Sequence, residues 1–484
     1  PADRERNTVM TILEEADADK RVLIGQFVSQ DGRVSTVNVD DRILDHGAMA
    51  GDRFEFMGQA NETRGRFRFE VSPFLYRDVL ALRRPALVMS RMFDEELPVE
   101  STVPPRDVDL TMWPVTLDVP VASWHQKLAT VDGRVAFVGG MNTKGTDWDG
   151  PDMRVFEPRR MTFDASTSDR MEVEEREREP DFGPRKDYMT RLEGPIVADV
   201  DDLFHLRWSH LLGAGARYAE NASDFEVPAP PAELAGGVQA QLTATLPQPF
   251  WEHSIAETWF NAVGNAERYI FIEDQYFRVP MLVDAIIERM TAVPSLQLVV
   301  VTKPVSETAD PGCEWTHRTH QELSALFPTR YHLYQLRAFD TVVTFGVDET
   351  EERFTDIDIH SKLLIVDDVF LSIGSCNKNN RGIVYEGELN VAVLDRAWVT
   401  AQRDRVLGLM LPEGAAIRED WITQLAEAAS WNQLVWDNWE AEGGDISLDG
   451  DPLPMEYTPA GRVYPLDFRH PDECFIEGVG PDMT

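Results

Sequence analysis

Apolar runs of strand length alternate with amphipathic segments in the second half of the chain. Apolar residues recur at helical spacing in "SIAETWFNAVGNA" (254–266) and "LVDAIIERM" (282–290). Nearly continuous apolar runs occur in "RYIFIEDQYF" (268–277) and "LQLVVVT" (296–302). Because helices that alternate with buried strands are typical of α/β proteins, the pattern predicts helix, strand, helix and strand in this order.

Two further apolar pairs predict β-hairpins. In the first half, "LATV" and "RVAFVGG" flank the turn dipeptide Asp132-Gly133. In the second half, "DIHSKLLIVDDVFLSIGS" (358–375) has two apolar runs around a second polar turn. Residues 164–187 are dense in charge and predict a surface loop or a short solvated helix. Residues 221–237 are rich in Pro, Ala and Gly and predict a linker.

The two hairpin regions contain the same arrangement of chemical groups. "HQKLATVDGRVAFVGGMN" (125–142) and "HSKLLIVDDVFLSIGSCN" (360–377) match at identical offsets. The matched pairs are His125 and His360, Lys127 and Lys362, Asp132 and Asp367, Gly139 and Gly374, and Asn142 and Asn377. The chain has only seven lysines, and two of them occupy corresponding positions of this repeat. A compact ammonium kept at both positions indicates a point charge placed against an anion.

The length and the repeat together predict a two-lobed fold. A chain of 484 residues is too long for one ordinary core. We expect an N-terminal lobe over 1–220, a linker region over 221–240, and a C-terminal lobe with a tail over 241–484. The predicted class is α/β, with two similar α/β/α lobes whose mixed sheets pack about a pseudo-twofold axis.

The repeated residues suit chemistry on a phosphodiester. A histidine and a lysine at i and i+2 of a strand point to the same side, so His125 with Lys127 and His360 with Lys362 can share one pocket. The lysines can stabilise the charge of the transition state. One imidazole can attack phosphorus while the other transfers protons. Asn142 and Asn377 are candidates to bind the phosphate. Since the lysines supply positive charge, we predict no metal and no cofactor.

Composition narrows the range of partners. The 84 acidic residues exceed the 46 basic ones and give a net charge of −38. This charge opposes binding to nucleic acid, which normally needs clustered Lys and Arg, and discourages adsorption to strongly anionic membranes. No apolar run has the length of a membrane span, and no signal peptide is visible, so the compartment stays open. The three cysteines have neither a disulfide pattern nor metal-ligand spacing.

With its two HxKxxxxD motifs, the chain resembles the phospholipase D superfamily. Further segments are similar to the large phospholipases D and extend the resemblance over about residues 120–470. They are "IEDQYF" (272–277), residues 187–208 ending in F-x-x-R-W, residues 374–393 and "GRVYPLDF" (461–468). Departures from the family pattern at Trp124, Asn142 and Gly382 leave the head-group preference open.

The resemblance implies roles for further residues. In the family, a carboxylate outside each motif hydrogen-bonds a catalytic histidine, and Asp187 and Glu388 match these positions. Asp132 and Asp367 are expected to be structural. Family likeness favours His125 as the nucleophile, although the symmetry of the motifs permits the reverse assignment.

The implied activity is hydrolysis of glycerophospholipids to phosphatidic acid through a phospho-histidine, with transfer to another alcohol as a second outcome. We expect a monomer that acts at a membrane or micelle surface. A nuclease, a phospholipid synthase or transferase, and an inactive binding module are the alternatives. The charge opposes a nuclease, and cardiolipin-synthase-like enzymes usually carry N-terminal membrane helices, for which we find no signal. An inactive module would be expected to have lost a motif His or Lys.

Overall fold

The computed structural model describes most of the chain from residue 124 onward and short segments before it. The described residues are 20–24, 54–59, 66–71, 100–101, 115–120, 124–142, 147, 149–162, 164–216, 219–247, 249–304, 313–343, 350–441 and 458–466.

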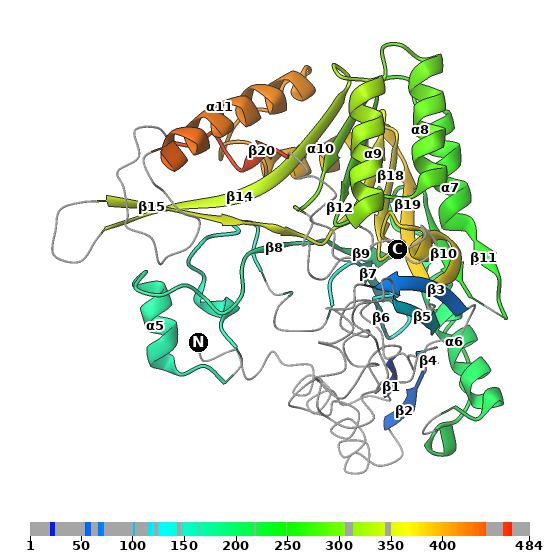
Figure 1. Cartoon of the computed structure of the whole chain (residues 1–484). Helices are drawn as coiled ribbons and strands as arrows, with labels where there is room; N and C mark the ends of the chain where they lie inside the picture. The colour runs from blue at the N-terminus through cyan, green and yellow to red at the C-terminus, as the bar shows by residue number, and fades with distance from the viewer. Residues whose placement is uncertain are drawn as a thin grey trace.

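A mixed sheet dominates the second half of the chain (Figure 1). Among the described residues it contains ten strands in the order β11-β10-β19-β18-β17-β12-β13-β14-β15, and β20 pairs with β14. The strands are β10 (Ala240–Leu246), β11 (Glu252–His253), β12 (Tyr269–Asp274), β13 (Gln297–Val301), β14 (Tyr331–Val343), β15 (Thr350–Asp356), β17 (Lys362–Val366), β18 (Phe370–Gly374), β19 (Glu388–Leu394) and β20 (Val463–Pro465). The pairs β12–β13 and β13–β14 are parallel, whereas β12–β17, β17–β18 and β18–β19 are antiparallel. The predicted α/β class with mixed sheets is confirmed.

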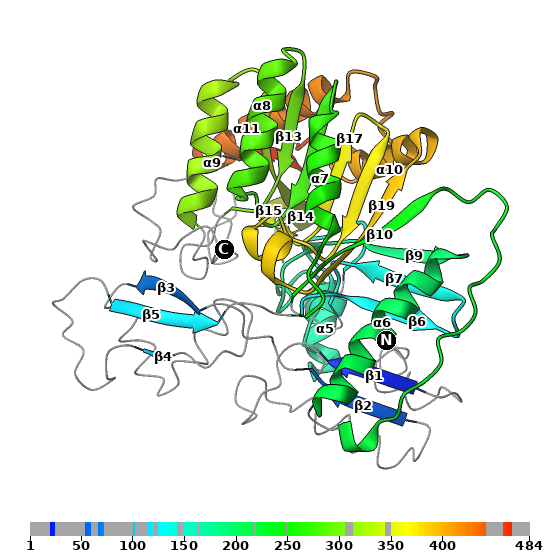
Figure 2. The same cartoon turned by 90° about the vertical axis from the view of Figure 1, so that its right-hand side faces the viewer.

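Helices cover both faces of this sheet (Figure 2). They are α7 (Ser254–Gly264), α8 (Pro280–Ala292), α9 (Cys313–Leu326), α10 (Arg396–Gly408) and α11 (Trp421–Ala441). The side chains of a strand point alternately to opposite faces, and β12 follows this rule. Ile270 and Ile272 join the core under α7, α8 and α9, whereas Tyr269 and Phe271 pack against Trp421 of α11 at ring distances of 4.9 and 6.2 Å. The helix–strand order expected for residues 254–302 is therefore confirmed.

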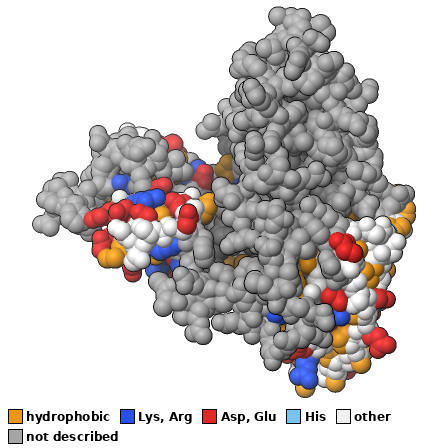
Figure 3. Space-filling view, turned by 90° about the horizontal axis from the view of Figure 1, so that it is seen from below, with side chains coloured by type: hydrophobic (Ala, Val, Ile, Leu, Met, Phe, Trp, Pro, Cys, Tyr) orange, Lys and Arg blue, Asp and Glu red, His pale blue; other side chains and the backbone are white. Residues whose placement is uncertain are grey.

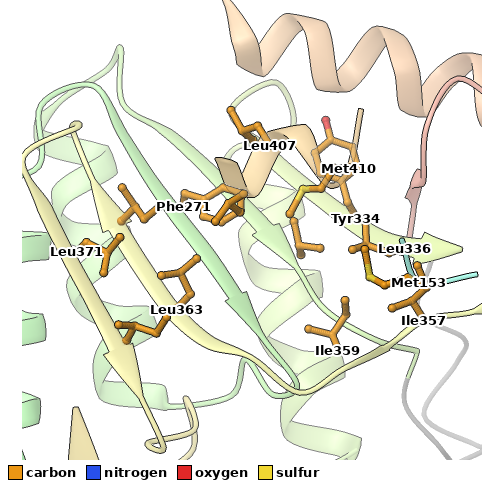
Figure 4. Close-up of a cluster of buried hydrophobic side chains, with 14 of the residues drawn as sticks. Met153, Phe271, Tyr334, Leu336, Ile357, Ile359, Leu363, Leu371, Leu407 and Met410 are labelled. Atoms are coloured by element: carbon orange, nitrogen blue, oxygen red, sulfur yellow. The ribbon is translucent and has the colours of Figure 1, made fainter. Parts of the chain in front are cut away.

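The core on the second face extends into the first half of the chain (Figure 4). Leu363 and Leu371 of the sheet and Leu407 of α10 belong to the same buried cluster as Met153 and Trp124. In Figure 4, Met153 lies close to Leu336 and Ile357. Since this cluster contains residues of both halves, the two halves share a hydrophobic core.

The first half contains a smaller sheet with the order β6-β7-β9. Its strands are β6 (Leu128–Val131), β7 (Val135–Gly139) and β9 (Met189–Glu193), and α6 (Ile196–Ala214) follows. Other elements of this half are β1 (Lys20–Ile24), β2 (Phe54–Gly58), β3 (Arg66–Val71), β4 (Glu100–Ser101), β5 (Val115–Pro120), η4 (Pro158–Arg160), α5 (Thr167–Glu174), β8 (Arg185–Lys186) and η5 (Ala219–Asn221). The predicted hairpin at Asp132-Gly133 is confirmed as β6–β7. The short solvated helix expected within 164–187 is α5, which begins with a capping box of Ser166 and Asp169.

The strands β6-β7-β9 repeat in β17-β18-β19 with equivalent registers. Gly139 pairs with Met189 in the first unit, and Gly374 pairs with Asn390 in the second. In the described residues the likeness of the halves extends over these three strands, and the sheet of the second half is much larger. Two fully similar lobes and the boundary at 221–240 therefore stay predictions. Residues 222–239 contain no helix or strand and lead into β10.

The described surface carries charges of both signs. In the view of Figure 3, Asp and Glu side chains lie among basic and hydrophobic ones on the described part of this face. Among the helices of the described segments, none combines the length and apolar character needed to cross a bilayer.

Candidate active site

Backbone pairing between the halves brings the two motifs to one place. The amide of His125 donates to the carbonyl of Gly387 at 2.9 Å, and the amide of His360 donates to the carbonyl of Lys186 at 2.9 Å. The two hydrogen bonds are equivalent, because Gly387 precedes Glu388 and Lys186 precedes Asp187. The strand β16 (Asp358–Ile359) runs parallel to β8 and continues this pairing in the second motif. The backbone of each motif histidine is thus hydrogen-bonded to the other half of the chain, at the residue directly before the acidic residue Glu388 or Asp187.

Each histidine contacts a buried carboxylate from the other half of the chain. His125 Nδ1 lies 2.8 Å from Glu388 Oε1, and His360 Nδ1 lies 2.6 Å from Asp187 Oδ2. Both contacts use Nδ1, so the other ring nitrogen, Nε2, is the one that does not face the carboxylate. A carboxylate at Nδ1 fixes the orientation of an imidazole and stabilises its protonated form. The structure therefore contains two crossed histidine–carboxylate dyads, His125–Glu388 and His360–Asp187.

The carboxylates of Asp187 and Glu388 accept hydrogen bonds from different neighbouring groups. Asp187 Oδ1 accepts the amide of Tyr188 at 2.7 Å, and a Cβ added at Gly140 would overlap this carboxylate. At the equivalent position of the second motif, Ser375 donates its hydroxyl to Glu388 Oε2. The second glycine of the pair in the first motif, Gly140, thus leaves the room that the close approach of Asp187 needs.

The motif lysines bend back toward their histidines. Lys127 Nζ donates to the backbone carbonyl of His125 at 2.7 Å, and Lys362 Nζ donates to that of His360. Lys362 also lies 3.4 Å from Gln275 Oε1, at the end of β12. Burial lowers the pKa of Lys362, although the charge of Asp187 acts in the opposite direction.

Burial dominates the electrostatics of the dyads. It raises the pKa of Asp187 to about 7 and the pKa of Glu388 to about 8. Burial, and then the charge of Lys362, holds the pKa of His360 well below its usual value, and Lys127 and His125 act in the same direction. Because both motifs contribute to the pKa of His360, the two half-sites form one electrostatic cluster.

The two candidate phosphate-binding asparagines differ. Asn142 donates its backbone and side-chain amides to the carboxylate of Asp147 at 2.8 and 2.6 Å. Asn377 is buried, and within the described part of the chain its Oδ1 has no hydrogen-bond partner. A buried amide oxygen without a partner is costly, and it is satisfied by a group that donates a hydrogen bond, such as a hydroxyl or a water molecule.

The motif aspartates lie in the hairpin turns. Both adopt left-handed backbone conformations, with φ of 55° at Asp132 and 56° at Asp367. The Asp367 carboxylate accepts the backbone amides of Glu267, Arg268 and Tyr269 at 2.6 to 2.8 Å. This contact fixes the start of β12 at the end of the hairpin remote from His360, which agrees with the expected structural role.

Three charged residues near the site, Asp147, Arg185 and Lys186, were not predicted from the sequence. Arg185 forms ion pairs with Asp358 at 2.9 Å and with Asp147 at 3.4 Å. Glu273 accepts Lys186 Nζ and Ser361 Oγ, each at 2.6 Å. Arg185 and Lys186 directly precede Asp187 in the sequence, so this adjacency could have indicated that they lie near the site. Asp147 carried no comparable signal.

Two groups of acidic and histidine side chains have the proximity needed for a metal. The potential ligand atoms of Asp147, Asp187 and His360 lie within 4.8 Å of one another, and those of His125, Glu386 and Glu388 do the same. Within both groups the histidine already contacts a carboxylate through Nδ1. We therefore interpret them as hydrogen-bonded dyads with an additional carboxylate nearby.

The fold and the site define a class of proteins: mixed α/β proteins with two HxKxxxxD half-sites that meet around one centre. Comparisons with known proteins agree with this class. The probable cardiolipin synthase YwiE of Bacillus subtilis is 24% identical over 273 residues, which cover 56% of this chain and 42% of that protein. Phospholipase D A of Dictyostelium discoideum is 26% identical over 324 residues, covering 57% of this chain and 24% of the relative. Phospholipase D alpha 1 of Carica papaya is 24% identical over 366 residues, covering 54% and 44%.

These matches support the assignment of the chain to the phospholipase D superfamily, as the motifs predicted. The chain spans less than half the length of these three relatives. No family model matches it. Among solved structures, Nuc of Salmonella typhimurium, a phospholipase D family member, aligns with a TM-score of 0.25 and 15% identity, over 35% of this chain and 91% of Nuc.

Proposed function

We propose that the chain is a phospholipase D-type phosphodiesterase that cleaves the head-group phosphodiester of glycerophospholipids at a membrane or micelle surface. The crossed dyads are the observation that carries the proposal. Each dyad pairs a motif histidine with a buried carboxylate, and each histidine is accompanied by its motif lysine. Two such half-sites supply a nucleophile, an acid and base, and positive charge around one phosphorus atom.

In the first step His125 Nε2 attacks phosphorus, and a P–N bond forms as the P–O bond to the head group breaks. His360 acts in its protonated form and gives a proton to the departing alcohol oxygen, and the negative charge of the bound phosphodiester opposes the burial that lowers the pKa of this histidine. The ammonium groups of Lys127 and Lys362 stabilise the additional negative charge on the phosphoryl oxygens. Asn142 and Asn377 are expected to donate neutral hydrogen bonds to the same group.

In the second step His360 removes a proton from water, whose oxygen attacks phosphorus and breaks the P–N bond. The products are phosphatidic acid and regenerated His125. Another alcohol in place of water would give a transferred phosphatidyl group. The reverse assignment of the histidines has the same balance of atoms, and mapping the phosphorylated histidine in rapidly quenched enzyme distinguishes the two.

A phospholipid synthase is the second candidate, favoured by the relatives that are named cardiolipin synthases. The deciding assay offers phosphatidylcholine, phosphatidylethanolamine and phosphatidylglycerol in mixed micelles, with bis-nitrophenyl phosphate and plasmid DNA in parallel. We expect phosphatidic acid and free head group, lost in His125→Ala and in His360→Ala. Cardiolipin from phosphatidylglycerol without hydrolysis would favour the synthase, and DNA cleavage would favour a nuclease. Turnover that survives either histidine substitution would refute the mechanism.

We also expect the enzyme to act as a monomer, because one chain supplies both half-sites. Sedimentation velocity measures the state directly. An obligate dimer with activity that falls on dilution would contradict this expectation.

A further inference from the structure

One buried arginine of α6 has no acidic partner among the residues that the structure describes. The side chain of Arg207 is almost inaccessible, at 5% exposure. Within the described residues it forms no ion pair with a carboxylate, and burial alone lowers its pKa, to about 9. A buried cation is costly unless its hydrogen bonds are satisfied, so the groups around Arg207 indicate why the position holds an arginine.

The guanidinium contacts both neighbours of His125. Its carbon lies 4.7 Å from the centre of the Trp124 ring, on the N-terminal side of the histidine. On the C-terminal side, Nη1 donates to Gln126 Oε1 at 2.8 Å. The amide of Gln126 in turn donates to the backbone carbonyl of Glu388 at 3.1 Å. Arg207 is therefore connected to the residues on both sides of His125 and, through Gln126, to the backbone of Glu388.

The remaining donors of Arg207 reach the N-terminal part of the chain. Nε donates to Gln59 Oε1 at 3.0 Å, and Nη2 donates to the same oxygen. Gln59 directly follows β2 and is buried. An amide oxygen accepts both hydrogen bonds without neutralising the cation, so the planar fork of the arginine is held from two sides.

The other half-site has a counterpart of opposite charge. Ser361, which follows His360 as Gln126 follows His125, donates its hydroxyl to the buried Glu273 at 2.6 Å. Glu273 is neutralised by Lys186 at 2.6 Å, whereas Arg207 has no such counter-ion among the described residues. The residue after each motif histidine is thus held by a different buried charge.

We propose that Arg207 is a positioning residue that fixes the His125–Glu388 dyad through Trp124 and Gln126. The inference rests on the proposed function only for its catalytic consequence. Without the guanidinium, the segment around His125 loses a stacked cation and a hydrogen bond at the same time. The dyad geometry then loosens, and a displacement of about 1 Å can cost on the order of 100-fold in rate.

Arg403 offers a matched control. It is also a buried arginine on a helix, α10, and its guanidinium carbon lies 5.9 Å from the Trp421 ring. It pairs with Asp368, in the β17–β18 turn, at the end of β17 remote from Lys362. Arg403→Met should therefore lower thermal stability without changing the dyad.

The experiment combines kinetics with proton NMR of the histidine rings. The Nδ1 proton shared by His125 and Glu388 should give a downfield resonance, assigned by its loss in His125→Asn and in Glu388→Gln. In Arg207→Met we expect this resonance to broaden or move, and kcat to fall about 100-fold with little change in KM. Arg207→Lys keeps the positive charge but loses the planar guanidinium group, so we expect the same changes in the resonance and in kcat as in Arg207→Met. Added guanidinium ion should restore part of kcat in Arg207→Ala.

An unchanged resonance and kcat in Arg207→Met would overturn the proposal, and so would equal losses in Arg403→Met. If Arg207→Met does not fold, Gln126→Leu breaks the same connection, and an unchanged resonance there would also overturn it. The NMR readout needs no substrate. A wild-type chain that cleaves none of the phosphodiesters would refute the proposed function while the resonance still decides the role of Arg207.

Discussion

Replacing Glu388 with Gln should lower activity and at the same time change how stability depends on pH. Glu388 is fully buried between His125 and Ser375. Gln keeps the shape of the side chain but cannot ionise, so it can never supply the negative charge that stabilises an imidazolium. In the serine-protease triad, the corresponding carboxylate-to-amide change lowers kcat about 10⁴-fold, so we expect a loss of about 10²- to 10⁴-fold here.

The stability effect follows from the pKa of the carboxyl group. Burial raises the pKa of Glu388 from 4.5 to about 8, a difference of about 3.5 units. Between these values the folded chain holds a proton that the unfolded chain has released. Stability therefore falls as pH rises from 4.5 to 8, by up to about 1.4 kcal/mol per unit and about 5 kcal/mol in total. Below pH 4.5 neither state is ionised, and the penalty is absent.

Urea denaturation of wild type and Glu388→Gln at several pH values between 5 and 8 measures this slope. In the variant, the part of the decrease in unfolding free energy that comes from the Glu388 proton should be absent. The difference in unfolding free energy between the variant and wild type should therefore shift in favour of the variant as the pH rises. Glu413→Gln, at an exposed position between α10 and α11, serves as the control and should leave the slope unchanged. Parallel pH slopes in wild type and Glu388→Gln, or wild-type activity in the variant, would refute the reasoning.

Three further single variants and one double variant test other buried contacts. Lys362→Met should lower kcat about 10²- to 10³-fold with intact folding, as loss of one transition-state donor does, and steady-state kinetics with circular dichroism checks both. Gly140→Ala should displace Asp187, since the added Cβ overlaps its carboxylate, and a kcat equal to wild type would contradict this contact. Lys378→Met leaves the buried Asp274 without its partner at 3.0 Å and should cost about 3–5 kcal/mol in urea denaturation. Adding Asp274→Leu should recover most of that loss, and a larger loss in the double variant would refute it.

The local elements were predictable because each depends on a short stretch of sequence. The hairpin β6–β7 follows from two apolar runs around Asp132-Gly133, and α7 and β12 follow from periodicity and length. The size of the second-half sheet was not predictable in this way. It depends on pairs such as β14 with β20, whose residues are more than a hundred positions apart.

The candidate residues of the site could be named from the sequence, but the hydrogen bonds between them could not. The repeat identified the four motif residues, and the resemblance added Asp187 and Glu388. Neither source indicated which carboxylate faces which histidine. That choice is made by the backbone hydrogen bonds from His125 to Gly387 and from His360 to Lys186, which exist only once the two halves have paired.

The crossed pairing of histidines and carboxylates makes the site depend on both halves of the chain. Because each dyad takes its histidine from one half and its carboxylate from the other, neither half alone contains a complete dyad. The same strands that exchange these hydrogen bonds also contribute to the hydrophobic cluster that both halves share. The shared core and the two dyads are therefore built from the same strands. A substitution that loosens the packing between the halves should therefore disturb both histidine–carboxylate dyads together, even where it contacts neither histidine.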